Sequence, residues 1–478
     1  MIMQMTDETT AITMCAEGAV LSDAGDTAGA LARYRAAVSM APSILSLHLI
    51  LSNAELLAGD VLAARATLRR ATRVASRPDA ATEFLLGKAL VDAGAGADAV
   101  PCFRRARSEY PNDAAAASAL ASSLREAQRP DEAWREISHA LHLAPEDPVA
   151  LLTAASIKHD LADFSGALAL CEQSLAIRPA SSGALLIRGY LRYLLGDTAG
   201  AWHDFEARAL PEPQTHARLW QGESLLGSTI AVLGEQGVGD QFQFLRFVLH
   251  PVLQDAARVI ITCQPDAVSL CRAAGFDAVK RTDIIETDYY VPLLSLPLRL
   301  DIGAQWRPYS TGPAYLSIDA SAYVPRARPR RVGVVWAGNP AHRNDAARSI
   351  PEGMMHGLLH THADIDFVCM QHGVVPADFP TAKWDVQPSG DWLETARQLR
   401  TLDLLITVDT GIAHLAGAFG IPTWVLLPHV PDWRWGATGS TTPWYPTARL
   451  FRQPSRGDWA RVLTNVSAAL SGAALAPS

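Results

Sequence analysis

A polar turn between an apolar strand and a helix is the strongest chemical signal in the sequence. The strand-like run 404–408 leads through Asp409, Thr410 and Gly411 into an apolar helical stretch that contains His414. The free amide groups at the start of a helix can bind a diphosphate, helped by the helix dipole. Asp409 would repel a phosphate, so we expect it to hold the loop or to bind sugar hydroxyls. For His414 two roles stay open: donating to a phosphate, or filling a polar pocket.

A glycine-rich loop at 234–240 also joins a strand-like run to a helix. Gly237 and Gly239 allow close approach of the backbone to a ligand. A dinucleotide fold would need an acidic residue about twenty positions further on. The next strand ends at Gln264 instead, which argues against an NAD-dependent oxidoreductase. Asp240 keeps two interpretations, a helix N-cap worth about 1 kcal/mol or a general base at the lip of a cleft.

A third loop, at 337–351, contains Asn339, Arg343 and Arg348. Two arginines between a strand and a helix suit a leaving diphosphate, on which negative charge grows in the transition state. An ordinary exposed position is the alternative for both, more so for Arg343. A later segment, 431–452, gathers tryptophans and arginines after another strand. Its aromatic side chains either stack on a base or sugar or pack the loop itself.

Two patterns resemble metal sites without fitting them well. Asp364 and Asp366 form a DxD triplet that leads directly into a strand, and His356, His360 and His362 lie near the end of a helix. The triplet is a short motif, and the histidines fit a solvated helix end. We therefore expect no metal site.

The N-terminal region repeats with a period of 34 or 35 residues. Each repeat has a turn, then a small residue that lets two helices approach closely, and a proline that ends the second helix. The alanines are Ala30, Ala64, Ala99, Ala133, Ala167 and Ala201, and the prolines are Pro42, Pro78, Pro111, Pro145, Pro179 and Pro211. The pattern resembles about six tetratricopeptide repeats across 11–211. Such a solenoid has a concave face that can hold an extended segment of a protein partner.

The composition changes after the repeats. Ten of the twelve tryptophans lie beyond residue 213, where strand-like runs alternate with helical stretches. This alternation predicts parallel sheets whose ligands bind at the carboxyl ends of the strands. The charged, proline-containing segment 325–331 predicts a linker. We predict three domains: a repeat solenoid at 1–213 and two α/β domains at 214–325 and 326–478.

The overall composition is that of a globular protein. The chain has 478 residues, 49% of them hydrophobic and 19% charged, with a net charge of −8, which argues against a dedicated nucleic-acid binder. We expect neither a membrane span nor a secretory signal. The six cysteines are scattered with no CxxC pair. Such cysteines are typical of reduced thiols in the cytoplasm.

With these motifs in their order, the C-terminal part is similar to bacterial tetratricopeptide-linked glycosyltransferases. Their catalytic part resembles the heptosyltransferase family (glycosyltransferase family 9), and their layout resembles that of the protein O-linked N-acetylglucosamine transferases. The strings that carry the resemblance are GEQGVGDQFQFLRF, VPLLSLPL, VGVVWAGNPAHRND, RSIP, DLLITVDTGIAHLAGAFGIPTWVLLP, PDWRW and PWYPTARLFRQP. It implies a GT-B-type pair of Rossmann-like domains, with the acceptor in the first and the nucleotide sugar in the second. It also implies inverting transfer without a metal or another cofactor.

The resemblance also gives roles to single residues. Asp240 takes the place of the general base, and Arg348 stands where heptosyltransferases have a phosphate-binding lysine. The residues on the donor-binding motif are Asp409, Thr410, Gly411 and His414. The expected function is transfer of a sugar from a nucleotide-diphosphate donor to a hydroxyl acceptor, on a protein bound by the repeats. The alternative is a non-catalytic repeat adaptor with a degenerate transferase domain.

Overall fold

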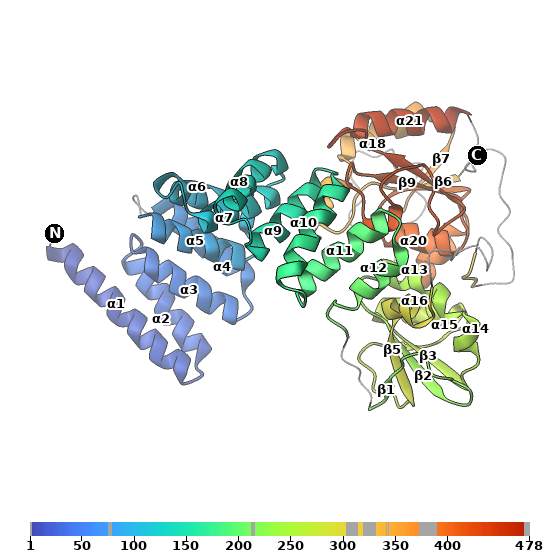
Figure 1. The fold of residues 1–478 in the computed structure, drawn as a ribbon, viewed down its shortest axis with the longest axis horizontal. Helices are drawn as coiled ribbons and strands as arrows, with labels where there is room; N and C mark the ends of the chain where they lie inside the picture. Colours follow the sequence, from blue (N-terminus) through green and yellow to red (C-terminus); the bar gives the residue numbers. More distant parts are fainter. Residues whose placement is uncertain are drawn as a thin grey trace. The chain divides into compact units, whose positions relative to one another are not determined.

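The computed structural model divides the chain into two compact units, Met1–Ala184 and Leu185–Ser478 (Figure 1). The residues that it describes are 2–74, 79–211, 216–302, 314–318, 331–340, 342, 344–371 and 390–472. The division falls inside a helix of the repeat array. The domain boundaries predicted at 213 and 325, with Pro78 and Arg343, lie outside the described residues. Those boundaries stay predictions.

The N-terminal unit is a stack of paired helices (Figure 1). The helices are α1 (Ile2–Asp23), α2 (Thr27–Met40), α3 (Leu45–Leu57), α4 (Val61–Val74), α5 (Ala80–Asp92), α6 (Val100–Glu109), α7 (Ala114–Glu126), α8 (Pro130–Leu143), α9 (Pro148–Asp160) and α10 (Phe164–Ile177). Two more follow, α11 (Ser182–Leu194), where the division falls, and α12 (Thr198–Phe205). The predicted helical repeat is confirmed.

The sequence markers of the repeat have the predicted places. All six marker alanines are at most 2% exposed, because each lies where two helices touch. All six turn positions have a positive φ, between 59° and 94°. Four of them are glycines, which adopt this conformation without strain, while Gln128 and Ala162 adopt it as well. The turn is therefore fixed by the packing of the helices on either side, even where glycine is missing.

The C-terminal unit contains two five-stranded parallel sheets. The first has β1 (Arg218–Leu219), β2 (Thr229–Leu233), β3 (Arg258–Cys263), β4 (Asp277–Lys280) and β5 (Tyr289–Pro292), in the order β1-β5-β2-β3-β4. Its helices are α13 (Val238–Val248), α14 (Pro251–Gln254), α15 (Val268–Ala273) and α16 (Leu296–Arg299). The predicted parallel α/β architecture is confirmed.

The second sheet has the same layout. Its strands are β6 (Arg331–Val335), β7 (Asp366–Cys369), β8 (Leu404–Val408), β9 (Thr423–Leu427) and β10 (Ala448–Arg452), in the order β10-β9-β8-β6-β7. Its helices are α17 (Asp345–Arg348), α18 (Glu352–Thr361), α19 (Trp392–Leu399), α20 (Gly411–Ala418) and α21 (Trp459–Gly472). Its apolar strands are buried under α18 and α21, as expected for a parallel sheet covered by helices.

Each sheet has one point where the strand order reverses. In the first sheet β2 lies between β3 and β5, and in the second β6 lies between β7 and β8. The loops after the two strands at such a switch point diverge and leave a crevice, which is where ligands bind in open α/β sheets. The glycine-rich loop follows β2, and the loops with Asn339 and Asp409 follow β6 and β8. The predicted chemical residues therefore lie at the switch points.

The two sheets are joined where the first turns of α13 and α20 meet. A Cβ atom on Gly239 would lie 3.1 Å from the Cα atom of Gly411 and 3.0 Å from Cδ2 of His414. A Cβ atom on Gly411 would lie 3.6 Å from the backbone nitrogen of Gly239. The two glycines therefore allow a backbone-to-backbone contact that side chains would prevent.

We predict that Gly239→Ala destabilises the C-terminal unit by about 1–3 kcal/mol, the usual range for overpacking. The added methyl group meets backbone on one side and the buried ring of His414 on the other, and neither can move freely. Denaturant unfolding followed by tryptophan fluorescence measures the effect.

The matched control is Gly357→Ala on α18, where a Cβ atom meets nothing within 4 Å. Because glycine in an exposed helix costs up to about 1 kcal/mol relative to alanine, this change should be neutral or stabilising. Equal effects of the two substitutions would contradict the close contact.

Candidate functional site

Asp240 lies in the first turn of α13. The helix begins at Val238 with Gly237 as its N-cap, so the prediction that Asp240 itself is the N-cap is wrong by three residues. Its Oδ2 atom instead accepts a hydrogen bond from the Gly237 amide, 3.0 Å away, in the reciprocal position of a capping box. The other oxygen, Oδ1, binds the guanidinium of Arg434. The carboxylate thus stabilises the helix start with one oxygen and faces the second sheet with the other.

Arg434 is the centre of a cluster of polar side chains from both sheets. Its Nη2 binds Asp240, its Nη1 donates to Asp432 Oδ1 at 2.8 Å, and its Nε donates to Gln243 Oε1 at 3.0 Å. The guanidinium also lies 4.4 Å from the ring centre of Trp433. Burial lowers the pKa of Arg434, but the charges of Asp240 and Asp432 outweigh this effect and raise it. The guanidinium therefore stays charged.

Asp409, at the end of β8, has an unusual carboxyl group. Burial raises its pKa to about 6, and the negative charge of Asp432 adds to the increase, while Arg434 and Arg348 oppose it. Arg348 also connects two loops, because its Nη1 donates to the Asp409 carbonyl at 2.9 Å and its Nε to Asp345 Oδ1 at 3.2 Å. Near neutral pH, Asp409 is therefore close to the point where it takes up a proton.

His414 is buried and neutral. Burial, with the nearby charge of Arg434, lowers its pKa to about 3. Its Nδ1 lies 2.9 Å from the Tyr445 hydroxyl, and its ring stacks on Trp435 at 5.1 Å. Its Nε2 lies 4.0 Å from Asp409 Oδ1. Of the two roles left open above, donating to a phosphate or filling a polar pocket, these contacts fit the second.

The start of α20 is partly covered. Thr410 is the N-cap, and its carbonyl accepts from the Ala413 amide at 3.0 Å. The Gly411 backbone packs against Gly239 of α13. The expected amide cradle for a diphosphate thus borders directly on the loop that carries Asp240.

The loop after β6 supports Arg348. The Gly338 amide donates to Ser349 Oγ at 3.0 Å, and a side chain on Gly338 would collide with the Arg348 guanidinium. The Asn339 carbonyl accepts from the His342 amide at 2.9 Å and so closes a turn. Asn339 therefore lies on the loop after β6 and Arg348 at the end of the short helix α17 that follows this loop, while Arg343 lies outside the described residues.

The loop of Asp240 is held by a buried ion pair. Glu235 binds Arg208 through two hydrogen bonds of 2.7 Å each, and both side chains are at most 6% exposed. Glu235 Oε1 also accepts from the Leu294 amide at 2.9 Å, so the carboxylate bridges the ends of β2 and β5. The chain's own side chains thus fill the switch point of the first sheet.

Aromatic rings hold the segment of Arg434 in place. Trp433 begins a short 3-10 helix, Trp433–Trp435. Its ring lies 4.7 Å from that of Tyr193 in α11 and 5.0 Å from that of Phe205 in α12. The last two helices of the repeat array therefore position Arg434. The sequence pattern of this loop predicts ligand stacking or loop packing and does not single out Arg434 or Asp432, although the string PDWRW places opposite charges two residues apart.

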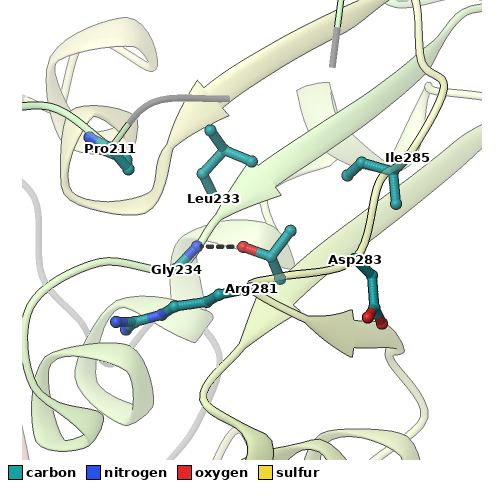
Figure 2. Close-up of a pocket in the computed structure, with 7 residues that line it drawn as sticks. Pro211, Leu233, Gly234, Arg281, Asp283 and Ile285 are labelled. Carbon is teal, nitrogen blue, oxygen red and sulfur yellow. Dashed lines mark hydrogen bonds between the residues drawn. The ribbon is translucent and has the colours of Figure 1, made fainter. Parts of the chain in front are cut away.

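A separate small pocket of about 150 Å³ lies at the carboxyl ends of β2, β3 and β4 (Figure 2). Its lining residues are Pro211, Leu233, Gly234, Thr262, Arg281, Asp283 and Ile285. None of the predicted site residues lines it. Arg281 reaches the Asp240 loop from there, since both of its terminal nitrogens donate to the Gln236 carbonyl at 3.3 Å.

Three further observations concern metals, membranes and thiols. Within the described ranges, no three or more histidine, cysteine or carboxylate side chains are grouped so that they could hold a metal ion. No helix in that part of the chain has the length and apolar character needed to cross a bilayer. All six cysteines are free thiols, and five of them are buried.

Comparison with known proteins shows tetratricopeptide repeats in the N-terminal region. The tetratricopeptide repeat family model matches residues 15–81 and 84–148. Protein FlbA of Caulobacter vibrioides is 23% identical in an alignment 462 positions long, and the match covers 77% of this chain and 74% of that protein.

Similar solved structures include tetratricopeptide repeat proteins and PilF. YrrB, described as having an unusual peptide-binding site, is 22% identical and covers 37% of this chain and 90% of its own, with a TM-score of 0.31. A Parabacteroides merdae repeat protein is 15% identical over 41% of this chain and 78% of its own, with a TM-score of 0.35. Pseudomonas aeruginosa PilF is 18% identical, and the match covers 42% of this chain and 90% of its own, with a TM-score of 0.30.

His414 should make stability pH-dependent. The unfolded chain takes up a proton at His414 near pH 6.5, whereas the folded protein does so only near pH 3. Stability from this residue is therefore complete above pH 6.5 and is lost as the pH falls, by about 2 kcal/mol at pH 5. We predict that His414→Gln reduces the loss of unfolding free energy between pH 8 and pH 5 by this amount, measured by urea titration.

Asp409 shifts stability in the opposite direction over this pH range, but it contributes to both proteins and cancels in the difference. The exposed His360 on α18 provides the control, and His360→Gln tests whether loss of any histidine has the same effect. If His414→Gln and the parent protein lose the same stability at pH 5, His414 is not held neutral by the fold.

Proposed function

We propose that this chain is a glycosyltransferase that moves a sugar from a nucleotide-diphosphate donor to a hydroxyl acceptor. The observation that carries the proposal is the convergence of Asp240 with Arg434, Asp409 and Arg348 beside the switch point of the second sheet. This arrangement has one carboxylate for the acceptor and two cations for the leaving group. In keeping with the family resemblance, the transfer inverts the anomeric carbon and requires no metal.

The chemistry assigns one task to each group. The acceptor hydroxyl attacks the anomeric carbon and gives its proton to Asp240, while the bond from that carbon to the diphosphate oxygen breaks and its electron pair leaves with the diphosphate. A positioned carboxylate base typically accelerates such a step by about 10²- to 10⁴-fold. Arg434 and Arg348 would stabilise the charge that develops on the leaving diphosphate.

The donor site must also accept an anion next to carboxylates. The raised pKa of Asp409, about 6, allows this residue to take up a proton when a diphosphate approaches. A protonated Asp409 would donate to an oxygen of the donor instead of repelling it. His414 adds a neutral polar group within 4.0 Å of that carboxyl.

We further propose that the acceptor is a protein or peptide held by the repeats. Repeat solenoids bind extended segments on their concave face and do little chemistry themselves. The six free cysteines support action in the cytoplasm, where thiols remain reduced.

A non-catalytic adaptor is the second candidate, and the tetratricopeptide repeats favour it, because repeats alone suffice for binding a partner. In that case the cluster around Arg434 would serve only to hold the two sheets together. Transfer activity separates the two candidates.

Asp240→Asn should strongly reduce transfer without weakening donor binding. The amide cannot accept the proton of the acceptor, so turnover should fall about 10²- to 10⁴-fold. We would measure release of nucleoside diphosphate from a panel of UDP-, GDP-, ADP- and dTDP-sugars, with water or protein as acceptor. Calorimetry on the same samples reports binding.

Asp255→Asn is the matched control. Asp255 is an exposed carboxylate at the C-terminal end of α14, beside the same sheet as Asp240. It should release nucleoside diphosphate at the parent rate. Release of nucleoside diphosphate at the parent rate by Asp240→Asn would show that this residue is not the base. If the parent protein released none from any donor, the glycosyltransferase proposal would fail and the adaptor would be the remaining candidate.

A further inference from the structure

Arg434 connects two elements that are 194 residues apart in sequence, since it binds Asp240 from the opposite sheet. Its Nε donates to Gln243, which also belongs to α13. Its remaining partner, Asp432, lies on its own short 3-10 segment, where it also accepts from the Arg434 amide at 3.0 Å. If the guanidinium turned toward β8, it would keep Asp432 and give up only the two partners on α13.

Asp240 has less freedom than Arg434. Its Oδ2 is fixed by the Gly237 amide at the helix start, and its backbone belongs to α13, which packs against α20. An arginine side chain, in contrast, can redirect its terminal nitrogens by rotation about the bonds of its stem. Between these two partners, the arginine is the one that can move.

The charges around Arg434 set a condition for binding an anion. Asp240, Asp409 and Asp432 surround it, and the charge of each contributes to its raised pKa. Arg348 is the second cation at the site, and it is partly neutralised by Asp345 at 3.2 Å. A diphosphate that enters here therefore meets few free positive charges unless Arg434 changes partners.

We propose that Arg434 is a clamp that Asp240 and the diphosphate of the donor share. When the diphosphate binds at the ends of β6 and β8, Nη2 of Arg434 leaves Asp240 Oδ1 and donates to a phosphate oxygen. The released Oδ1 then accepts the proton of the acceptor hydroxyl. This inference rests on the proposed function and adds to it an order of events, in which donor binding activates the base.

The same exchange protects the base. While Arg434 binds Oδ1, a hydroxyl or water molecule at the site competes with a charge-assisted hydrogen bond for that oxygen. The acceptor hydroxyl therefore loses its proton only after the donor, with its leaving diphosphate, has bound. Arg434 therefore contacts the base, Asp240, before the donor binds and contacts the donor afterwards.

A double-mutant cycle tests the clamp. The probes are inorganic pyrophosphate, ADP, GDP and UDP, and calorimetry gives their dissociation constants for the parent protein, Asp240→Asn, Arg434→Gln and the double variant. Asp240→Asn removes the competitor for Arg434, so each probe that binds the parent should bind about tenfold more tightly, since a hydrogen bond to a charged group is worth roughly that factor. Arg434→Gln should weaken binding about tenfold for the same reason.

The double variant distinguishes the clamp from simple repulsion. If Asp240 only repels the anion, its replacement tightens binding equally with or without Arg434. The clamp requires the gain to shrink to about twofold or less once Arg434 is gone. An undiminished gain in the Arg434→Gln background, or no gain from Asp240→Asn alone, would overturn the proposal and leave the donor site standing.

Ser269→Ala is the matched control for loosening of the unit. Ser269 Oγ donates to Asp391 Oδ1 at 2.7 Å and joins the same two halves without touching Arg434. It should leave all the dissociation constants unchanged. If Arg434→Gln does not fold, by circular dichroism, Arg434→Lys replaces it in the cycle, because lysine keeps the charge without the planar fork. Failure of every probe to bind the parent would overturn both the donor site and the clamp.

Discussion

The Arg434 side chain, only 12% exposed, can lie between two sheets because carboxylates surround its guanidinium. An unpaired charge in such a place would cost several kcal/mol, roughly the penalty for removing one partner of a buried pair. Asp240 supplies one carboxylate from α13 and Asp432 supplies another from the arginine's own segment. The pairing of Arg434 with Asp240 thus holds the start of α13 against the segment that follows β9. The first turn of α13 also meets the first turn of α20, where Gly239 contacts Gly411.

The end of the repeat array supports this centre. Tyr193 and Phe205 pack on Trp433, next to Arg434, and Arg208 holds Glu235, five residues before Asp240. Both supports lie within the C-terminal unit, whose boundary at Leu185 includes most of α11 and all of α12. The last repeat therefore serves the α/β part as a structural element, while the repeats of the N-terminal unit keep their own cores.

Much of the fold could be predicted from local sequence. The period of the repeats, the buried marker alanines and the apolar strands β2, β3, β6, β8 and β9 each follow from patterns within a few residues. Two strands with charged residues could not be recognised in this way: β4 begins with Asp277 and ends with Lys280, and β10 carries Arg449 and Arg452 in a segment interpreted as a loop. Their pairing depends on neighbouring strands that local patterns do not specify.

The residues of the site divide in the same way. The positions of Asp240, Arg348 and Asp409 after strands could be predicted, because loops between strands and helices are marked by glycine and polar residues after an apolar run. Their roles in a site stay predictions. Arg434 could not be identified from a local sequence pattern, because its role depends on Asp240, a partner 194 residues away. The pKa shifts of Asp409 and His414 depend on burial, which is a property of the folded chain.

The proposed donor site lies at the ends of β6 and β8. The most direct test is thermal unfolding of the parent protein with a panel of nucleotide sugars and nucleoside diphosphates that differ in base. A ligand at 100 times its dissociation constant stabilises the folded state by about 2.7 kcal/mol. If the donor site is present, we expect a clear increase in melting temperature for one base, shared by its nucleoside diphosphate and its sugar conjugates. An unchanged melting temperature for every compound at millimolar concentration would contradict it.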